Sequence, residues 1–554
     1  MSASAKKKLR KEQSTSQMTE KQLNEQKEAK KLKIYTTVFV VAIAAVLVAG
    51  LVFAGMNIYN KSGIVEKNMV AATINDEELN SVQLSYYYVD TVNANLSQWS
   101  NTYGESLSLF LNLMGIDPTL PLSEQSYNEE ITWADYFIES ALEQAKSEYM
   151  LAAAAEAEGF ALSETELQAV ENTISTVSMY AMLYGYNDLG TYLKANYGPG
   201  ADEASYRAYQ EKSVLAASYY EAHQNDLVID DAAIREYEDG RYDEFSSYSF
   251  ATYHLGYKDY LTGGTEAEDG TMVYTAEEED AARAAAKADA ELLAQATTVE
   301  ELDKAIAALA INEGSLTASS SVFNNSLYST ISTIYRDWLT DHSRKDGDCE
   351  AIAYESVVTD EAGNESTVVN DYYTVMFLGS KNNETKMANV RHILVNFQGG
   401  TTDDLGNTTY SDEEKATAKA AAEEILAEMT ADGTVTEEEF SDMAINKSAD
   451  TGSASTGGLF ENVTPEDGVY VDEFRDWAMD PTRAAGDVDI IETVYGYHIM
   501  YYVGDAEMNY RDYMISEAIR SDRMTEWYDG VVAGAVATVM DSSRLNKDIV
   551  LNVA

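Results

Sequence analysis

Hydrophobic residues recur with a helical period through much of the first half of the chain. A first helix is expected from about Glu77. The run that opens with Trp133-Ala134-Asp135-Tyr136-Phe137-Ile138 stays amphipathic to about Glu158, which precedes a glycine that suits a C-cap. Ser163-Glu164-Thr165-Glu166 has the pattern of a capping box and predicts another helix start. We therefore predict a mainly helical domain over residues 69–245.

Tyrosine and methionine gather in two stretches of this helical region, 86–88 and 179–186. Large apolar residues at helical spacing most often form the core of a domain. The alternative is a pliable apolar surface that holds unfolded chains, because Met and Tyr side chains adapt to many partners. The pattern alone leaves both interpretations open.

The second half of the chain contains an internal repeat. Residues 335–348 align without a gap to residues 474–487 at an offset of 139, and the Ala-rich helices upstream align at an offset of 136. Such a nearly constant offset indicates a duplication. Each copy is predicted to run strand, helix, helix, turn-rich loop, short helix and strand, which is an α+β unit with a small antiparallel sheet. We expect the copies at 246–380 and 386–504.

Two of the five histidines lie in the strand-like segments that bracket the second copy. His392 is central in Asn389-Val390-Arg391-His392-Ile393-Leu394-Val395, and His498 follows Tyr495-Gly496-Tyr497. In the first copy, Tyr373 aligns with His498, and His254 falls opposite His392. Because only one histidine remains there, we expect the first copy to be inactive as an enzyme. The alternative for the pair in the second copy is that the two rings simply bond to each other and rigidify the sheet.

The charge of the chain is strongly acidic and unevenly placed. The formal net charge is −56, although residues 1–33 hold ten Lys or Arg against four Glu. Nucleic acid is excluded as a partner, because a phosphate backbone requires a basic face. The acidity instead suits a protein kept soluble in an exposed, salty setting. The sequence has no Asp-x-Asp-x-Asp-Gly loop that would indicate a calcium site.

An uncharged apolar run of 23 residues, 34–56, follows the basic segment. This length spans a bilayer and exceeds a typical signal-peptide core. By the positive-inside rule, residues 1–33 stay cytoplasmic and the rest is translocated across the cell membrane. We expect a single-pass anchor, and a cleaved signal peptide is the alternative. The one cysteine, Cys349, excludes an intramolecular disulfide and is expected to be a small buried hydrophobe.

The second copy resembles the parvulin family of peptidyl-prolyl isomerases over roughly 115 residues. The resemblance lies in 391–395, Glu439-Phe440-Ser441-Asp442-Met443-Ala444, Ser448-Ala449-Asp450, Gly457-Gly458-Leu459-Phe460, Phe474 and 495–499. The helical region, the anchor and the C-terminal tail resemble extracytoplasmic foldases of the SurA/PrsA kind. That resemblance implies that residues 505–554, with a returning helix from Tyr510 to Met540, complete the helical domain.

The resemblance also implies the roles of individual residues. His392 and His498 would form the paired-histidine network, Asp450 would face the rotating bond, and Thr493 would hydrogen-bond into the pair. The walls of the proline pocket would be Leu459, Phe460, Tyr470 and Phe474. Asp450 has an alternative role as a turn cap after Ser448. The family's usual Gly-Gly-Asp-Leu-Gly run is Gly457-Gly458-Leu459-Phe460 here, without its Asp or third Gly, and Tyr470 stands where the family commonly has Met.

The expected function is therefore that of a foldase that catalyses X-Pro isomerisation and assists the folding of exported polypeptides. The reaction needs no metal, nucleophile or cofactor, because the barrier of about 18–20 kcal/mol comes from amide resonance. One alternative is a non-catalytic holdase chaperone whose parvulin-like domains only bind clients. A structural surface protein is another, although it does not explain the histidine pair. The sequence leaves open a homodimer and the identity of the clients.

Overall fold

The computed structural model describes residues 62–554 apart from 268–269, 313–317, 360–364, 404–406, 432, 467, 552 and 554. Before residue 62 it describes only Ser4, Lys6–Lys8, Lys31, Lys33 and Tyr59. The predicted anchor at 34–56 lies outside the described residues, as does most of the basic segment 1–33. None of the helices in the described part is long and apolar enough to cross a membrane.

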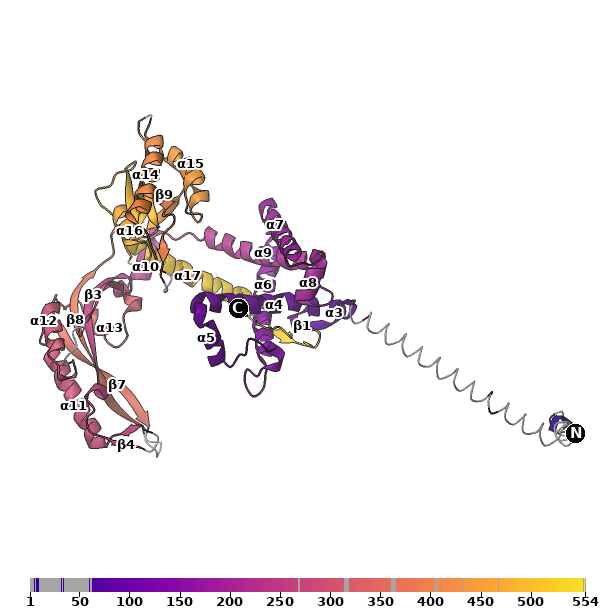
Figure 1. The fold of residues 1–554 in the computed structure, drawn as a ribbon, viewed down its shortest axis with the longest axis horizontal. Helices are drawn as coiled ribbons and strands as arrows, with labels where there is room; N and C mark the ends of the chain where they lie inside the picture. The colour runs from indigo at the N-terminus through magenta and orange to yellow at the C-terminus, as the bar shows by residue number, and fades with distance from the viewer. Residues whose placement is uncertain are drawn as a thin grey trace. The chain divides into compact units, whose positions relative to one another are not determined.

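The chain forms two compact units, Met1–Leu227 with Met524–Ala554 and Val228–Arg523. The first unit is mainly helical (Figure 1). Its elements are α3 (Ile64–Asn68), β1 (Val70–Ile74), β2 (Glu77–Asn80), α4 (Ser81–Tyr103), α5 (Leu107–Leu113), α6 (Trp133–Glu158), α7 (Glu164–Leu183), α8 (Leu189–Tyr197), α9 (Glu203–Asp226) and β15 (Ala537–Val539). The three strands form an antiparallel sheet in the order β15-β1-β2.

The helix ends follow the capping residues of the sequence. Helix α6 ends at Glu158, with Gly159 in the left-handed region at φ 76°, and α7 begins after the capping box of Ser163, so both predictions are confirmed. The expected helix start at Glu77 is wrong, because residues 77–80 pair with β1 as strand β2. Helix α4 starts only after Asn80, whose side chain accepts a hydrogen bond from the Gln83 N–H.

The two Tyr- and Met-rich stretches have opposite environments. Tyr86, Tyr87 and Tyr88 are completely buried in α4. The C-terminal end of α7 is exposed instead, with exposed fractions of 63% at Met182 and 74% at Leu183. The first stretch is therefore core, and the second is an exposed apolar surface. We call the second the α7 surface and define it by Met179, Tyr180, Met182, Leu183 and Tyr184.

The C-terminal segment returns to the helical unit through α17 (Tyr510–Val532). Its second half packs there, with the Trp527 ring stacked on His223 at a centroid distance of 4.0 Å. The helix is shorter than the predicted 510–540. Gly534 takes a left-handed φ of 73°, and the residues that follow, which include the β-branched Thr538 and Val539, join the sheet as β15, paired with β1.

The second unit begins with α10 (Asp231–Glu238) and contains two α+β repeats in succession. The first repeat comprises β3 (Ser247–Gly256), β4 (Thr265–Glu266), β5 (Met272–Val273), α11 (Ala276–Leu293), α12 (Val299–Ala307), β6 (Ser321–Leu327), α13 (Arg336–Leu339), β7 (Cys349–Thr359) and β8 (Glu365–Lys381). The second comprises β9 (Lys386–Asn396), β10 (Thr401–Thr402), β11 (Thr408–Thr409), α14 (Asp412–Met429), α15 (Glu437–Lys447), β12 (Leu459–Val463), α16 (Asp472–Ala478), β13 (Val488–Thr493) and β14 (Gly496–Asn509).

The two repeats share one sheet topology. The strand order is β6-β3-β8-β7 in the first and β12-β9-β14-β13 in the second, and all neighbours are antiparallel. One face of each sheet is covered by an Ala-rich helix, α11 or α14. Alanine lets these helices approach the strands closely, as Ala286 and Ala290 do in the first repeat. The expected α+β architecture is thus present in both halves of this unit.

The register of the sheets corrects one alignment. Phe377 and Tyr502 are equivalent, because each exchanges backbone hydrogen bonds with a Gly-Asp turn at 347–348 or 486–487. Two residues before them, Val375 pairs with Thr252, whereas Met500 pairs with His392. Thr252 therefore occupies the position of His392, and the predicted equivalence of His254 is wrong by two residues. Tyr373 stands where the second repeat has His498, so the first repeat has neither histidine.

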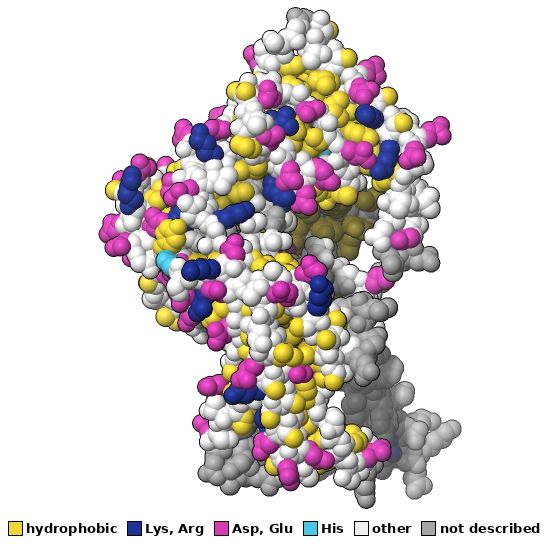
Figure 2. Space-filling model, turned by 90° about the vertical axis from the view of Figure 1, so that its left-hand side faces the viewer, with side chains coloured by type: hydrophobic (Ala, Val, Ile, Leu, Met, Phe, Trp, Pro, Cys, Tyr) yellow, Lys and Arg dark blue, Asp and Glu magenta, His cyan; other side chains and the backbone are white. Residues whose placement is uncertain are grey.

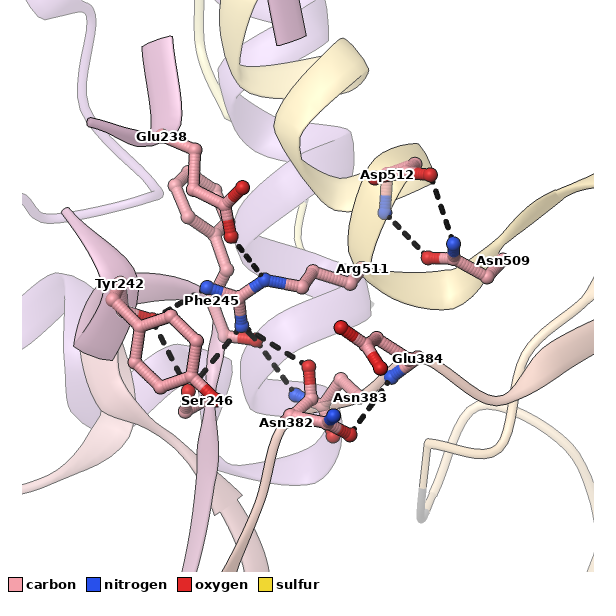
Figure 3. Close-up of polar contacts among 10 residues, drawn as sticks. All are labelled: Glu238, Tyr242, Phe245, Ser246, Asn382, Asn383, Glu384, Asn509, Arg511 and Asp512. Carbon is pink, nitrogen blue, oxygen red and sulfur yellow. Dashed lines mark hydrogen bonds and ion pairs between the residues drawn. The ribbon is translucent and has the colours of Figure 1, made fainter. Parts of the chain in front are cut away.

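Arg511, at the start of α17, ties that helix to the segments that flank the first repeat (Figure 3). Its guanidinium is almost fully buried and forms an ion pair with Glu238 through Nε. It also donates to the backbone carbonyls of Tyr242, Phe245 and Asn382. These bonds satisfy a charge that would otherwise be costly to bury, and they fix the helix start within the second unit.

Two further expectations concern the surface and the cysteine. Figure 2 shows a face on which acidic side chains are spread between scattered basic ones, without a continuous basic patch. Cys349 is half-buried at the start of β7, and burial raises the pKa of its thiol to about 11. It is therefore an unreactive residue packed at the edge of the first repeat's core.

Candidate active site

His392 and His498 meet on one face of the second repeat's sheet. They come from neighbouring antiparallel strands, β9 and β14, and are offset by two positions in the pairing. The rings are stacked, with centroids 5.1 Å apart, and their Nδ1 atoms lie 2.8 Å apart. Both residues are buried, with exposed fractions of 4% and 5%. The sheet therefore brings together the two histidines that the sequence singled out.

A chain of hydrogen bonds runs through the pair. Asp450 Oδ2 lies 2.8 Å from His392 Nε2, and Thr493 Oγ1 lies 3.0 Å from His498 Nε2. A carboxylate can only accept, so His392 donates from Nε2 and its Nδ1 accepts from His498 when the ring is neutral. His498 Nε2 must then accept from the Thr493 hydroxyl. One set of tautomers thus satisfies these three contacts, from Thr493 to His498 to His392 to Asp450, with each donor directed toward Asp450.

The pKa values favour neutral rings. Burial lowers the pKa of His392, although Asp450 partly opposes the shift. Burial and then repulsion by His392 lower the pKa of His498 to about 4. Partial burial opposes ionisation of Asp450, but hydrogen bonds from Ser453, His392 and the Gly452 N–H outweigh it and lower the pKa of the carboxyl. At neutral pH the site is a charged carboxylate backed by two neutral imidazoles.

Ser453 belongs to this network and was missed by the sequence analysis. Its hydroxyl lies 2.5 Å from Asp450 Oδ2 and 3.1 Å from His392 Nε2. Its position three residues after Asp450 is the only signal in the sequence. Asp450 Oδ1 meanwhile accepts from the Gly452 N–H at 3.1 Å, so the turn-capping role is also present. One oxygen of Asp450 shapes the turn, and the other binds the histidine.

The backbone geometry of the Gly457-Gly458 turn requires glycine. Gly458 has a left-handed φ of 68°, and a Cβ atom there would lie 2.1 Å from the His392 carbonyl oxygen. The close approach allows the His392 N–H to donate to the Gly458 carbonyl at 2.9 Å. Arg391 holds the same loop by donating to the carbonyls of Thr456 and Gly457. The loop thus keeps its function of seating the next strand, β12, against His392.

Aromatic rings stand beside the histidines. Phe460 and Phe474 lie edge-on to His392, with centroid distances of 5.1 and 5.5 Å. Tyr470 stacks on Phe474 at 5.7 Å and is half-buried. These three predicted pocket residues therefore lie together. Leu459 does not join them, because it precedes Phe460 on β12 and consecutive strand residues point to opposite faces.

This arrangement combines an apolar aromatic wall with one fixed carboxylate. Asp450 is the partly exposed end of an otherwise buried polar chain, with 27% of its side chain exposed. The site holds no cysteine, and its serine and threonine hydroxyls are engaged in the hydrogen bonds of the network. It is therefore suited to binding a cyclic apolar group and polarising an amide, rather than to covalent catalysis.

Residues 372–505 match the family model of the PPIC-type PPIase domain. The chain contains a parvulin-type peptidyl-prolyl isomerase domain. The matched segment of the parvulin-type domain starts within β8 and runs through most of β14, so it includes both histidines and the whole hydrogen-bond chain. No curated protein matches the chain.

Several solved structures are similar to this chain. PrsA from Bacillus cereus is 22% identical, with 27% of this chain and 49% of that chain covered and a TM-score of 0.16. PrsA from Bacillus subtilis is 23% identical, with 29% and 55% covered and a TM-score of 0.17. A structure described with the SurA-like chaperones PEB4 and Cj1289 of Campylobacter jejuni is 12% identical, with 67% and 81% covered and a TM-score of 0.13. The chain thus spans about half the length of these PrsA structures, and the function proposed below rests on the family match and the site.

Proposed function

We propose that the chain is a membrane-anchored extracytoplasmic foldase that isomerises X-Pro bonds and assists the folding of exported polypeptides. The observation that carries the catalytic part is the hydrogen-bond chain Thr493–His498–His392–Asp450, which ends beside the aromatic rings of Phe460 and Phe474. The family match to residues 372–505 supports the same reaction. The anchor and location rest on the apolar run 34–56 and the basic residues before it.

The proposed mechanism requires only binding and electrostatics. Rotation about the X-Pro bond costs about 18–20 kcal/mol because the twisted amide loses its resonance. The proline ring would pack against Phe460, Phe474 and Tyr470. Asp450 would face the rotating amide. Twisting localises the lone pair on the nitrogen and reduces the negative charge on the carbonyl oxygen, so a fixed carboxylate near that oxygen would repel the planar amide more than the twisted one. The neutral histidines hold Asp450 in position, so little reorganisation is needed at the transition state.

The α7 surface supports client binding and keeps the holdase function as a second candidate. Its Met, Leu and Tyr side chains are exposed on one helix end, which is unusual for residues of this size. Flexible Met and Leu side chains adapt to clients of different sequence. In the holdase alternative, this surface and the parvulin-like domains only bind clients, and the histidine pair stiffens the sheet.

A proline-isomerisation assay on the purified full-length chain separates the two candidates. The foldase predicts a rate above the uncatalysed one, with a large fall in His392→Ala and a smaller fall in Ser453→Ala. Circular dichroism of each variant controls for folding. A wild-type rate equal to background would remove the catalytic part, and suppression of client aggregation by the same preparation would then favour the holdase.

A further inference from the structure

The helical unit has a pocket of its own, with a volume of about 490 Å³. It lies between the start of α4, the middle of α6 and the first half of α9. Pockets for small ligands and side chains typically measure about 300–1,000 Å³. One face of α9 forms much of its wall, through Ala204, Ala208 and Lys212 at intervals of four residues.

The aromatic walls of the pocket are held rigidly. The Tyr87 hydroxyl donates to Glu148 at 3.0 Å, and the Tyr209 hydroxyl donates to Asp90 at 2.9 Å. The Tyr87 and Tyr209 rings also meet edge-to-face at a centroid distance of 4.9 Å. Both hydroxyls are bonded to carboxylates and Tyr87 is only 1% exposed, so these two lining rings are fixed in position. A flat or branched apolar group is the natural complement.

The charge of the lining differs from that of the whole chain. Its charged residues are Lys67, Lys212 and Asp202, a net charge of +1, in a chain whose formal charge is −56. The Lys67 ammonium is paired with Asp202. The Lys212 ammonium lies 4.2 Å above the Tyr149 ring, and among the described residues it forms no ion pair. The Lys212 ammonium therefore lies at the aromatic wall of the pocket and is available to form an ion pair with an anionic group of a ligand.

We propose that this pocket binds a carboxylate next to an aromatic or large aliphatic side chain of a client polypeptide, with Lys212 as the counter-charge. The inference rests on the proposed client-binding function and gives it a chemical preference. A polypeptide is favoured as the ligand because α9, which lines the pocket, also packs against α7, the helix that ends in the α7 surface. The carboxylate has two sources, the C-terminus of a client or an Asp or Glu side chain.

The test measures binding of fluorescein-labelled peptides to the full-length chain by anisotropy. One peptide ends in phenylalanine with a free carboxylate, a second is its C-terminal amide, and a third is an amidated peptide with an internal Phe-Glu pair. Binding of the free acid about tenfold tighter than the amide is expected. If only the free-acid peptide binds tightly, the ligand is the C-terminal carboxylate of a client. If the amidated Phe-Glu peptide also binds tightly, the pocket accepts Asp or Glu side chains as well.

Two substitutions locate the effect. Lys212→Gln should remove the preference for the carboxylate, whereas Lys194→Gln, on the exposed face of α8, should leave it unchanged. Ala208→Trp, which places an indole at the exposed lining of the pocket, should weaken all three peptides. Equal binding of acid and amide, or a preference that survives Lys212→Gln, would overturn the proposal. Isomerase and aggregation assays on the same preparations test the proposed function separately. A chain that passes those assays but shows no carboxylate preference loses only the pocket proposal.

Discussion

The Nδ1 atoms of His392 and His498 face each other at 2.8 Å across strands β9 and β14. Only one proton fits between them, so one ring must accept and the other must donate. The carboxylate of Asp450 decides the direction, because it requires a proton on the far nitrogen of His392. The two imidazoles thus have a single arrangement of donors and acceptors at neutral pH.

Lowering the pH should destabilise the second repeat through His498. Its pKa is about 4 in the folded state, whereas an unfolded histidine has a pKa near 6.5. Between these values the unfolded state binds more protons, so stability falls as the pH drops through this window, by on the order of 1–2 kcal/mol at pH 5. Hydrogen exchange of β9 and β14 peptides at pH 7 and pH 5, corrected for intrinsic rates, measures this loss. His498→Gln should show a smaller loss; an equal loss would contradict the assignment.

Removing the Tyr470 ring should weaken substrate binding more than folding. The ring stacks on Phe474 and is half-buried, so Tyr470→Ala opens one wall of the pocket without creating a closed cavity. We expect kcat/KM for an X-Pro peptide to fall about fivefold, mainly through KM, as expected for lost apolar contact. Tyr495→Ala, in the exposed turn before β14, is the matched control and should change neither constant. A fall in kcat with an unchanged KM would show that Tyr470 does not act by binding the substrate.

Arg511→Met should destabilise the second unit strongly. The substitution leaves the Glu238 carboxylate without its partner and removes the donor to three backbone carbonyls. Breaking one side of a buried pair typically costs about 3–5 kcal/mol. Urea unfolding should show this loss, whereas Lys304→Met, which removes an exposed pair with Glu300, should cost less than about 0.5 kcal/mol. Similar costs for both would mean that Arg511 is not structurally important.

The α7 surface should matter for clients and not for the fold. A triple variant, Met182→Ser, Leu183→Ser and Tyr184→Ser, removes side chains that are 63–74% exposed. We expect weaker suppression of client aggregation with unchanged peptide isomerisation and unchanged unfolding midpoint. The paired substitution Leu109→Ser and Leu113→Ser, on the exposed side of α5, tests whether any loss of exposed leucine has the same effect. Equal effects of the two variants would show that the α7 surface is not specific.

Local signals predicted those parts of the fold that depend on short-range chemistry. The capping box of Ser163 and the glycine after Glu158 fixed helix ends that the structure shares. The start at Glu77 failed because pairing with β1 outweighed the helical pattern of that segment. The last helix ended early because residues after Gly534 join the same sheet. Strand pairing between distant segments is a tertiary effect that a local pattern does not contain.

The sequence predicted the site residues that belong to a rare residue type and missed one that belongs to a common type. Five histidines in 554 residues made the pair conspicuous, and the structure places Thr493 and Asp450 beside it. Ser453 escaped notice because serine is frequent and its role depends on a turn. His254 falls opposite His392 at a separation close to the offset of the repeat, although the backbone bonds of the Gly-Asp turns fix a register two residues away.

The most direct test of the account compares two carboxylates of similar exposure in one assay. Asp450 and Asp371 each lie beside a histidine, at 2.8 and 2.9 Å, with similar exposure, but only Asp450 belongs to the repeat with the histidine pair. Isomerisation of an X-Pro peptide by the full-length chain should fall at least about tenfold in Asp450→Asn, as expected for loss of a preorganised charge. The rate should be unchanged in Asp371→Asn. A wild-type rate equal to background, or equal losses in both variants, would contradict the assignment of the active site to the second repeat.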